Sequence, residues 1–390
     1  MTSQSTGGAA PRIGGKPRAR DLGIPFDGVP GALDAITDVP GLEVGLVTLV
    51  EGDGPHAART GVTAILPRGR GGIGTACAAA VHSFNGNGEL TGRTWIDESG
   101  SLSLPIAITN SHAVGPVHAG VDAWLARERP DIAAEWMLPV VGETWDGYLN
   151  DINGGHVRPE HAGAAIDAAA SGPVAEGNVG GGTGMNCYGF KGGTGTASRI
   201  VRYGDEEFVV AALIQANFGS RSELRLGGIP LGRESSAPNP MDDTDWFARD
   251  RARAAAPGGA GSAIVVIATD APFLPGQCAA LARRGALGLG RSGTAGSHFS
   301  GDIVLAFSTA NAGALSSSFP APDAAAEYET MRLIPWGRID PFLTAAVEAV
   351  DEAVWNALVA AEDMVGRNGH LSPALPHDDI RAAVARFAGA

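Results

Sequence analysis

The chain reads Ala254-Ala255-Ala256-Pro257-Gly258-Gly259-Ala260-Gly261 and then, with no polar spacer, Ser262 followed by Ala263-Ile264-Val265-Val266-Ile267-Ala268-Thr269. Glycine and proline at this density predict a loop. A short run rich in Val and Ile, entered from turn residues, predicts a buried β-strand. The sequence therefore places Gly261 and Ser262 where a loop enters the core of a sheet.

A Gly-Ser pair at such a place has the features of a self-cleaving precursor. The Gly261 carbonyl has no side chain beside it to hinder attack by the Ser262 hydroxyl. Cleavage would leave Ser262 with a free α-amine, whose reference pKa is about 7.7–8.0, so the amine can act as the base for its own hydroxyl. The alternative is an ordinary loop entering a strand, and the pair alone does not decide between the two.

Composition narrows the class of protein. The 390 residues are 44% hydrophobic and 18% charged, which favours a large core over disorder. A net charge of −14 argues against nucleic acid as a partner, because the longest basic cluster is Lys16 to Arg20. No secretory signal pattern and no segment apolar enough to span a membrane is found. Cys77, Cys187 and Cys278 are odd in number and far apart, which favours reduced thiols in the cytoplasm over a disulfide framework.

Short strands and helices alternate after a polar tail at residues 1–20. Runs bounded by Gly, Pro or Asn predict strands at 42–49, 61–66, 76–81, 105–109, 137–141, 197–202, 208–215, 263–269 and 303–308. Apolar spacing and helix-end signals predict helices at 117–129, 161–170, 245–255, 275–284, 340–365 and 377–387. This order predicts one layered α/β or α+β domain over residues 21–390, with a largely antiparallel core.

Three segments look like known ligand motifs but lack a necessary part. Gly288-Leu289-Gly290-Arg291-Ser292-Gly293 follows a predicted helix instead of opening one after a strand, and residues 180–184 lack the Lys-Ser/Thr ending of a phosphate loop. His156 and His161 are five residues apart with Pro159 between them, so a zinc helix is not expected. We find no Gly-x-Ser-x-Gly nucleophile elbow, and we expect neither a metal nor an organic cofactor.

Polar residues at strand ends remain as candidates for chemistry. Glu143 to Gly147 follows one predicted strand, Asn217 follows another, and Ser300-Gly301-Asp302 precedes a third. Ser300 and Asp302 are two residues apart, so at the start of a strand their side chains would share one face. A hydroxyl backed by a carboxylate could orient an amine or another hydroxyl. Local turn hydrogen bonding explains the pair equally well.

Taken together, several segments of this chain resemble the L-aminopeptidase D-amino-acid esterase and β-peptidyl aminopeptidase family of self-processing serine aminopeptidases. The matches span nearly the whole chain from about residue 18, in the expected order. The matching segments are Arg20-Asp21-Leu22-Gly23-Ile24, Ala35-Ile36-Thr37-Asp38-Val39-Pro40-Gly41, Asn85-Gly86-Asn87-Gly88-Glu89, Thr109-Asn110-Ser111-His112, Gly177-Asn178-Val179-Gly180-Gly181-Gly182-Thr183-Gly184, Gly189-Phe190-Lys191-Gly192-Gly193 and Ser300-Gly301-Asp302. The resemblance implies a four-layer αββα sandwich similar to the N-terminal-nucleophile hydrolases. It also implies self-cleavage between Gly261 and Ser262 into chains 1–261 and 262–390.

The resemblance also implies roles for individual residues. Ser262 is the nucleophile, supported by Ser300 and by an acidic residue two positions later. Asn217 matches an oxyanion-hole donor, and Glu143 matches the carboxylate that holds the free amino group of the substrate. The acidic residue is Asp302, where relatives often carry Glu, so its shorter side chain has less reach.

Two further positions concern the site. Trp145 stands where relatives have a Tyr that donates to the oxyanion, and an indole N–H can donate one hydrogen bond with a different reach. Lys191 lies in a matching Gly-rich segment, and a related branch that hydrolyses nylon oligomers uses a Lys near its nucleophile. Lys191 is therefore a further catalytic candidate.

The expected activity is removal of N-terminal residues from short peptides, amino-acid amides or esters, with β-peptides as one option. The expected assembly is a homo-oligomer, a tetramer of cleaved pairs as in relatives. Two alternatives remain open. One is an acyl transferase resembling the ornithine acetyltransferases, which cleave themselves before Thr where this chain has Ser262. The other is an unprocessed, non-catalytic relative.

Overall fold

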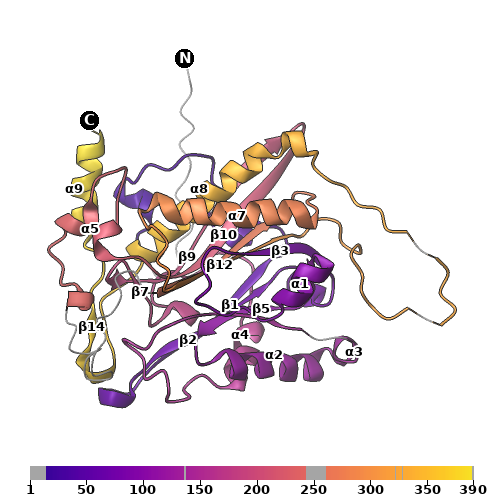
Figure 1. Ribbon diagram of the computed structural model, residues 1–390, viewed down its shortest axis with the longest axis horizontal. Coiled ribbons are helices and arrows are strands. Elements are labelled where there is room, and N and C mark those ends of the chain that lie inside the picture. The colour runs from indigo at the N-terminus through magenta and orange to yellow at the C-terminus, as the bar shows by residue number, and fades with distance from the viewer. Residues whose placement is uncertain (1–14, 136–137, 243–260, 321, 327, 389–390) are drawn as a thin grey trace.

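The computed structural model describes all residues except 1–14, 136–137, 243–260, 321, 327 and 389–390. Two β-sheets are stacked face to face, and a helical layer covers the outer face of each (Figure 1). This four-layer αββα sandwich is the fold expected from the sequence. The predicted helix at 245–255 lies outside the described residues.

The smaller sheet has the strand order β1-β2-β5-β6, and the larger has the order β4-β3-β12-β11-β10-β9. Among the pairs of named strands, β5 with β6 and β11 with β12 are parallel and the others are antiparallel, in agreement with the predicted antiparallel core. The strands are β1 (Glu43–Glu51), β2 (Ala58–Leu66), β3 (Cys77–Ser83), β4 (Ser101–Leu102), β5 (Ile106–Asn110), β6 (Val140–Thr144), β9 (Gly193–Tyr203), β10 (Glu206–Asn217), β11 (Gly261–Thr269) and β12 (Ser300–Ser308). Two small hairpins add β7 (Asn186–Cys187) with β8 (Phe190–Lys191), and β13 (Met364–Val365) with β14 (Leu371–Ser372).

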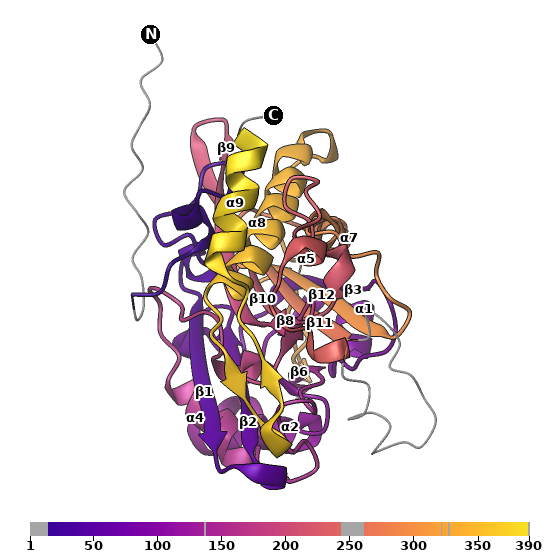
Figure 2. The same cartoon turned by 90° about the vertical axis from the view of Figure 1, so that its left-hand side faces the viewer.

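The helices form the outer layers. α7 (Pro275–Arg291) and α8 (Asp340–Val359) cover the larger sheet, and α2 (Val114–Glu128) and α4 (Pro159–Asp167) cover the smaller one (Figure 1). The shorter helices are α1 (Arg93–Ser99), α3 (Pro130–Ala133) and α5 (Leu231–Glu234). The C-terminal helix α9 (His377–Ala388) lies beside α5 (Figure 2), where Asp379 accepts a hydrogen bond from Ser235 Oγ at 2.6 Å.

Three apolar layers hold the sandwich together. The layer between the sheets takes side chains from both, among them Ile65, Ile108, Leu213, Val266 and Phe307. Alternate residues of β11 divide between the layers, because successive side chains of a strand point to opposite faces. Ala263, Val265 and Ile267 meet the helices, while Ile264, Val266 and Ala268 face the other sheet. Both faces of β11 are therefore buried, as the unbroken apolar run predicts.

Helix boundaries differ from the predictions most clearly at α7 and α8. α7 continues to Arg291, beyond the predicted end at 284, because its glycines serve close packing. A Cβ on Gly285 would lie 2.8 Å from Val304, and one on Gly288 would lie 2.6 Å from Val350 of α8. The dinucleotide-like Gly-x-Gly motif is thus mostly helix. α8 ends at Val359, short of the predicted 365, because Ala360 caps it and residues 364–365 instead form β13.

Strand boundaries also differ. β2, β9 and β10 are longer than predicted, so Asn217 is the last residue of β10 and does not follow the strand. β6 begins at Val140, directly after Pro139, whose nitrogen has no hydrogen to donate to a ladder. It runs to Thr144, so Glu143 lies inside the strand and does not follow it. Likewise β12 begins at Ser300, so the Ser300–Asp302 pair is inside the strand.

The N-terminal segment is packed from Arg18 onward, so the expected polar tail of residues 1–20 is too long. Ala19 is fully buried, and its N–H donates to Asn356 Oδ1 of α8 at 2.9 Å. Arg18 pairs with Glu176 at 2.8 Å and with Asp34 at 3.1 Å. Desolvation of these charges is offset by this pairing, which a solvated tail would not provide.

In the part of the chain that is described, no helix is long and apolar enough to cross a membrane.

Candidate active site

Ser262 is the second residue of β11, in the middle of the larger sheet. Asn217 of β10 is its register partner on one side, and Gly301 of β12 is its partner on the other. Gly261 is paired in the same way with Ser300. Ser262 is 2% exposed, and its Oγ accepts a hydrogen bond from the Trp145 main-chain N–H at 3.3 Å. The two neighbouring strands thus place Asn217 on one side of Ser262 and the Ser300–Asp302 segment on the other.

Asn217 is held rigidly beside Ser262. Its Nδ2 donates to the Trp145 carbonyl oxygen at 3.0 Å, and its Oδ1 accepts from the Asn186 N–H at 2.8 Å. An amide nitrogen carries two hydrogens, so one remains in addition to the bond with Trp145. The register of β10 and β11 therefore places an oriented amide donor next to the serine.

Trp145 meets the serine through its backbone. The sequence suggested the indole N–H as a donor, but the group that contacts Ser262 Oγ is the main-chain N–H, and the Trp145 residue as a whole is 37% exposed. The same residue offers its carbonyl to Asn217. A main-chain donor does not depend on whether the side chain is Tyr or Trp.

Ser300 and Asp302 form a buried pair at the start of β12, where Ser300 is the register partner of Gly261. Ser300 Oγ donates to Asp302 Oδ1 at 2.6 Å, so the shorter aspartate does reach the hydroxyl. Burial raises the pKa of Asp302, while hydrogen bonds from Ser300, from Asn85 and from the Ala263 N–H oppose that shift. The pair is an oriented hydroxyl with its hydrogen directed to a carboxylate.

Glu143 lies close to the residue that pairs with Ser262. A Cβ built on Gly88 would lie 3.4 Å from Glu143 Oε1 and 3.0 Å from the Gly301 Cα. Glu143 Oε1 accepts from the Glu89 N–H at 2.9 Å, and Oε2 accepts from Ser111 Oγ. Burial raises the pKa of Glu143, and these two donors counteract the rise. A buried carboxylate of this kind can hold a cationic amine.

Lys191 lies in the β7–β8 hairpin. Its Nζ is fully buried and donates to the carbonyl oxygens of Gly182, Met185 and Gly192 at 3.4, 2.9 and 2.9 Å. These are all the hydrogen bonds of Nζ within the described part of the chain, and none goes to Ser262. Burial lowers the pKa of Lys191 to about 7. Lys191 thus fixes the turn next to Asn186, whose N–H in turn holds Asn217.

Three residues of this site had no predicted role. Asn85 bonds Asp302, Ser111 bonds Glu143, and Asn186 bonds Asn217. Asn85 and Ser111 lie in segments that matched the family pattern, which is the signal that could have found them. Asn186 lies in none of the matching segments.

Among the described residues, no group of three or more His, Cys, Asp or Glu side chains is suited to a metal ion. His161, one of the two histidines considered above, accepts a hydrogen bond from the Arg158 N–H at 3.0 Å through Nδ1.

The four-layer sandwich, with a serine at the start of a central strand and amide donors beside it, defines a hydrolase of the N-terminal-nucleophile type. The sequence matches the profile of Peptidase family S58 over residues 34–372. It is 48% identical to the β-peptidyl aminopeptidase BapA of Sphingosinicella microcystinivorans, over 95% of this chain and 92% of that protein. It is 44% identical to BapA of Sphingosinicella xenopeptidilytica, with the same coverage.

Solved structures of related enzymes support the same family. The L-aminopeptidase D-Ala-esterase/amidase of Ochrobactrum anthropi, a prototype of the serine aminopeptidases with a variant Ntn hydrolase fold, superposes with a TM-score of 0.86 at 43% identity, over 96% of this chain and 99% of that one. A β-aminopeptidase from a Burkholderia species gives a TM-score of 0.84 at 43% identity, over 95% and 98%. This chain belongs to peptidase family S58, and it is a serine aminopeptidase of the N-terminal-nucleophile type. The acyl-transferase alternative is not favoured.

Proposed function

We propose that the chain cleaves itself between Gly261 and Ser262, and that the resulting pair of chains, 1–261 and 262–390, hydrolyses short substrates with a free amino terminus. The observation that carries the proposal is the position of Ser262. It stands at the start of a buried strand, between a fixed amide donor on β10 and the hydroxyl–carboxylate pair on β12.

Self-cleavage begins with attack of Ser262 Oγ on the Gly261 carbonyl carbon. The new C–O bond replaces the C–N bond between the two residues, and the hydroxyl proton passes to the departing nitrogen. Water then hydrolyses the ester, which leaves a carboxylate on Gly261 and restores the Ser262 hydroxyl. Gly261 suits this step, since a Cβ at 261 would lie 2.1 Å from the Asn217 carbonyl oxygen.

Substrate hydrolysis repeats the same attack on an external carbonyl. The Glu143 carboxylate holds the substrate ammonium group, and the Ser262 α-amine takes the hydroxyl proton and delivers it to the leaving group. The Asn217 amide and the Trp145 main-chain N–H stabilise the oxyanion, and each such donor is typically worth about 2.7–4 kcal/mol. Ser300 and Asp302 hold the α-amine in position next to β12. Water then releases the acyl group.

The substrate class follows from the amine anchor. A buried carboxylate selects a free ammonium group near the scissile carbonyl, so peptides, amides and esters of single amino acids fit. The names of the relatives favour β-peptides and D-alanine esters or amides among these. We further propose that the cleaved pairs form a homo-oligomer and that the protein is cytoplasmic. Three buried, unpaired cysteines are consistent with the cytoplasm.

Intact-mass analysis of freshly purified protein tests the processing step. Two masses, one beginning at Ser262, are expected, and a persistent full-length chain would contradict the proposal. Hydrolysis of the p-nitroanilides of L-alanine, D-alanine and β-alanine tests the activity, with the N-acetylated compounds as controls that lack the ammonium group. Size-exclusion chromatography with light scattering tests the oligomer.

A further inference from the structure

Asn85 makes contacts with Asp302 that no role assigned above explains. Its Nδ2 donates to Asp302 Oδ2 at 2.8 Å, and its Oδ1 accepts from the Asp302 main-chain N–H at 2.5 Å. The Asn85 Nδ2 also donates to the Ser297 carbonyl oxygen at 3.1 Å. The Asn85 side-chain amide therefore hydrogen-bonds both the carboxylate and the main-chain N–H of Asp302.

The loop that carries Asn85 is fixed to β12 along its length. The Phe84 N–H donates to the Asp302 carbonyl at 2.9 Å, and the Asn87 N–H donates to the Ser300 carbonyl at 3.3 Å. The loop lies so close over Gly301 that a Cβ there would be 2.4 Å from the Asn87 carbonyl oxygen. Asn85 is held in place from both sides, and its contact with Asp302 is not that of a mobile surface loop.

We propose that Asn85 is a positioning residue of the reaction: it holds the Asp302 carboxylate so that Oδ1 faces the Ser300 hydroxyl. This inference rests on the proposed function. With Oδ2 occupied by Asn85, the carboxylate cannot rotate without losing a hydrogen bond. The Ser300 hydroxyl therefore keeps donating its hydrogen bond to Asp302. The lone pairs of Ser300 Oγ stay available to the amine of Ser262 on the neighbouring strand.

The ionic state of Asp302 depends on this contact. Hydrogen bonds to the charged form of a carboxyl lower its pKa, and those from Ser300, Asn85 and the Ala263 N–H oppose the effect of burial. The ionisable groups near Asp302 include the Cys187 thiol of β7 and, once the chain is cut, the α-amine of Ser262 on the neighbouring strand. Burial raises the pKa of Cys187 to about 12, so this thiol is neutral at working pH.

Burial raises the pKa of Glu143 as well as that of Asp302, and the two carboxyl groups are separable by kinetics. Glu143 binds the substrate amine, so its protonation raises KM. Asp302 acts through the nucleophile, so its protonation lowers kcat. The Ser262 α-amine must be neutral to take the hydroxyl proton, so its protonation also lowers kcat on the acid side. The amine is present in every variant, so the test depends on the difference between variants. The effect of Asn85 is therefore expected in kcat and not in KM.

The test compares Asn85→Ala and Asn85→Asp with Asn87→Ala in the full chain. Asn87 lies in the same loop, and its side chain donates one hydrogen bond, from Nδ2 to the Phe299 carbonyl at 2.8 Å, and none to Asp302. We expect Asn85→Ala to move the acid limb of the kcat profile upward by about one pH unit. Asn85→Asp, which keeps the volume but adds a like charge, should move it further, and Asn87→Ala should match the wild type.

A uniform fall of kcat at every pH, or a profile like that of Asn87→Ala, would overturn the inference. Should Asn85→Ala fail to fold in thermal melting, the nearly isosteric Asn85→Asp carries the test, and the pH dependence of precursor cleavage gives a second readout. An inactive wild type would instead overturn the proposed function, so the two failures are distinguishable.

Discussion

The Gly261 Cα lies against the carbonyl of Asn217 so closely that a methyl group at 261 would be 2.1 Å from the Asn217 oxygen. The residue before the nucleophile and the candidate oxyanion donor are thus packed backbone to backbone. Replacing a hydrogen by a methyl group here must displace the scissile carbonyl.

Gly261→Ala should therefore slow self-cleavage. Overpacking of this kind costs about 1–3 kcal/mol, which corresponds to roughly ten- to hundredfold in rate if the strain falls on the cleavage step. Intact-mass analysis over time after expression measures the uncut fraction. Gly290→Ala is the control, since a Cβ at 290 meets nothing within 4 Å. Because residue 261 ends the first chain after cleavage, each molecule that is cut should have normal activity. A variant that cleaves at the wild-type rate would contradict the packing argument.

Ser262→Ala should give a single uncut chain with no peptidase activity. Removal of the hydroxyl leaves no nucleophile in either step, since the described neighbours on β10 and β12 contribute an amide and a hydroxyl already bonded to Asp302. Mass spectrometry and the p-nitroanilide assay measure the two losses. The exposed Ser317→Ala is a matched control. Cleavage at 261–262 in Ser262→Ala would show that another residue performs it.

The strands could be predicted, and Ser262 could be singled out as a candidate nucleophile, because these signals are local. An unbroken apolar run predicts β11, and a Gly-Ser pair stands at its start. Asn85 and Ser111 could not be assigned in this way. Their roles depend on β3 lying antiparallel beside β12, and on β5 lying beside β6, and no local pattern specifies which strands become neighbours. The same holds for Arg18, whose partners Asp34 and Glu176 are brought to it by the fold.

Glu143→Gln should weaken the binding of substrates with a free amine far more than it slows self-cleavage, because the Gly261 carbonyl has no adjacent ammonium group. Loss of a buried charged partner costs about 2 kcal/mol or more, which is roughly thirtyfold in KM. KM and the rate of precursor cleavage are the two measurements. Equal damage to both steps would mean that Glu143 does not anchor the amine.

The pH dependence of KM gives a second test of this anchor. Burial raises the pKa of Glu143, so the carboxylate becomes neutral as the pH falls through that value, and KM should rise on the acid side. Ser111→Ala removes a donor to the charged form. It should therefore move this rise to higher pH. An acid-side KM unaffected by Ser111→Ala would contradict the assignment.

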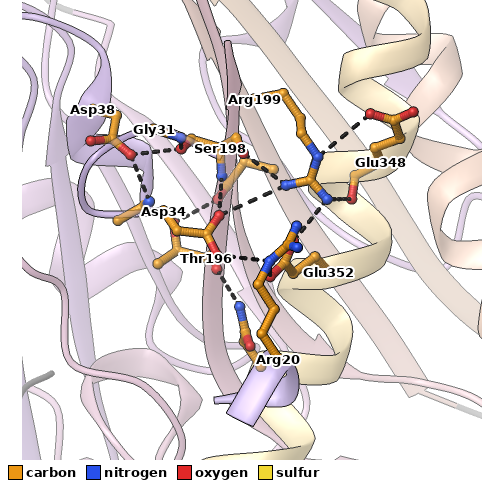
Figure 3. Close-up of polar contacts among 12 residues, drawn as sticks. Arg20, Gly31, Asp34, Asp38, Thr196, Ser198, Arg199, Glu348 and Glu352 are labelled. Carbon is orange, nitrogen blue, oxygen red and sulfur yellow. Dashed lines mark hydrogen bonds and ion pairs between the residues drawn. The ribbon is translucent and has the colours of Figure 1, made fainter. Parts of the chain in front are cut away.

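The last prediction concerns a buried ionic cluster that joins the N-terminal segment and β9 to α8 (Figure 3). Arg199 pairs with Glu352 at 2.7 Å, and both side chains are 1% exposed. Arg20 pairs with Glu352 at 2.6 Å. If the chain is cut at 261, these contacts connect the two products, because Glu352 belongs to the second chain and its partners to the first.

Asp34 in this cluster should make stability depend on pH. Burial, reinforced by the nearby Glu352 carboxylate, raises the pKa of Asp34 from 3.8 to about 7. The folded protein therefore keeps a proton that the unfolded chain loses above about pH 4. This contribution is fully present below the unfolded pKa and is lost as the pH rises through the folded one, so the free energy of unfolding should fall between about pH 4 and 7.

Asp34→Asn mimics the protonated form, so it should resemble the wild type at pH 5 and show a smaller loss of stability by pH 8. Urea unfolding at the two pH values measures the difference, with Asp323→Asn, on an exposed residue, as the control. Parallel losses in wild type and Asp34→Asn would show that Asp34 does not hold the proton.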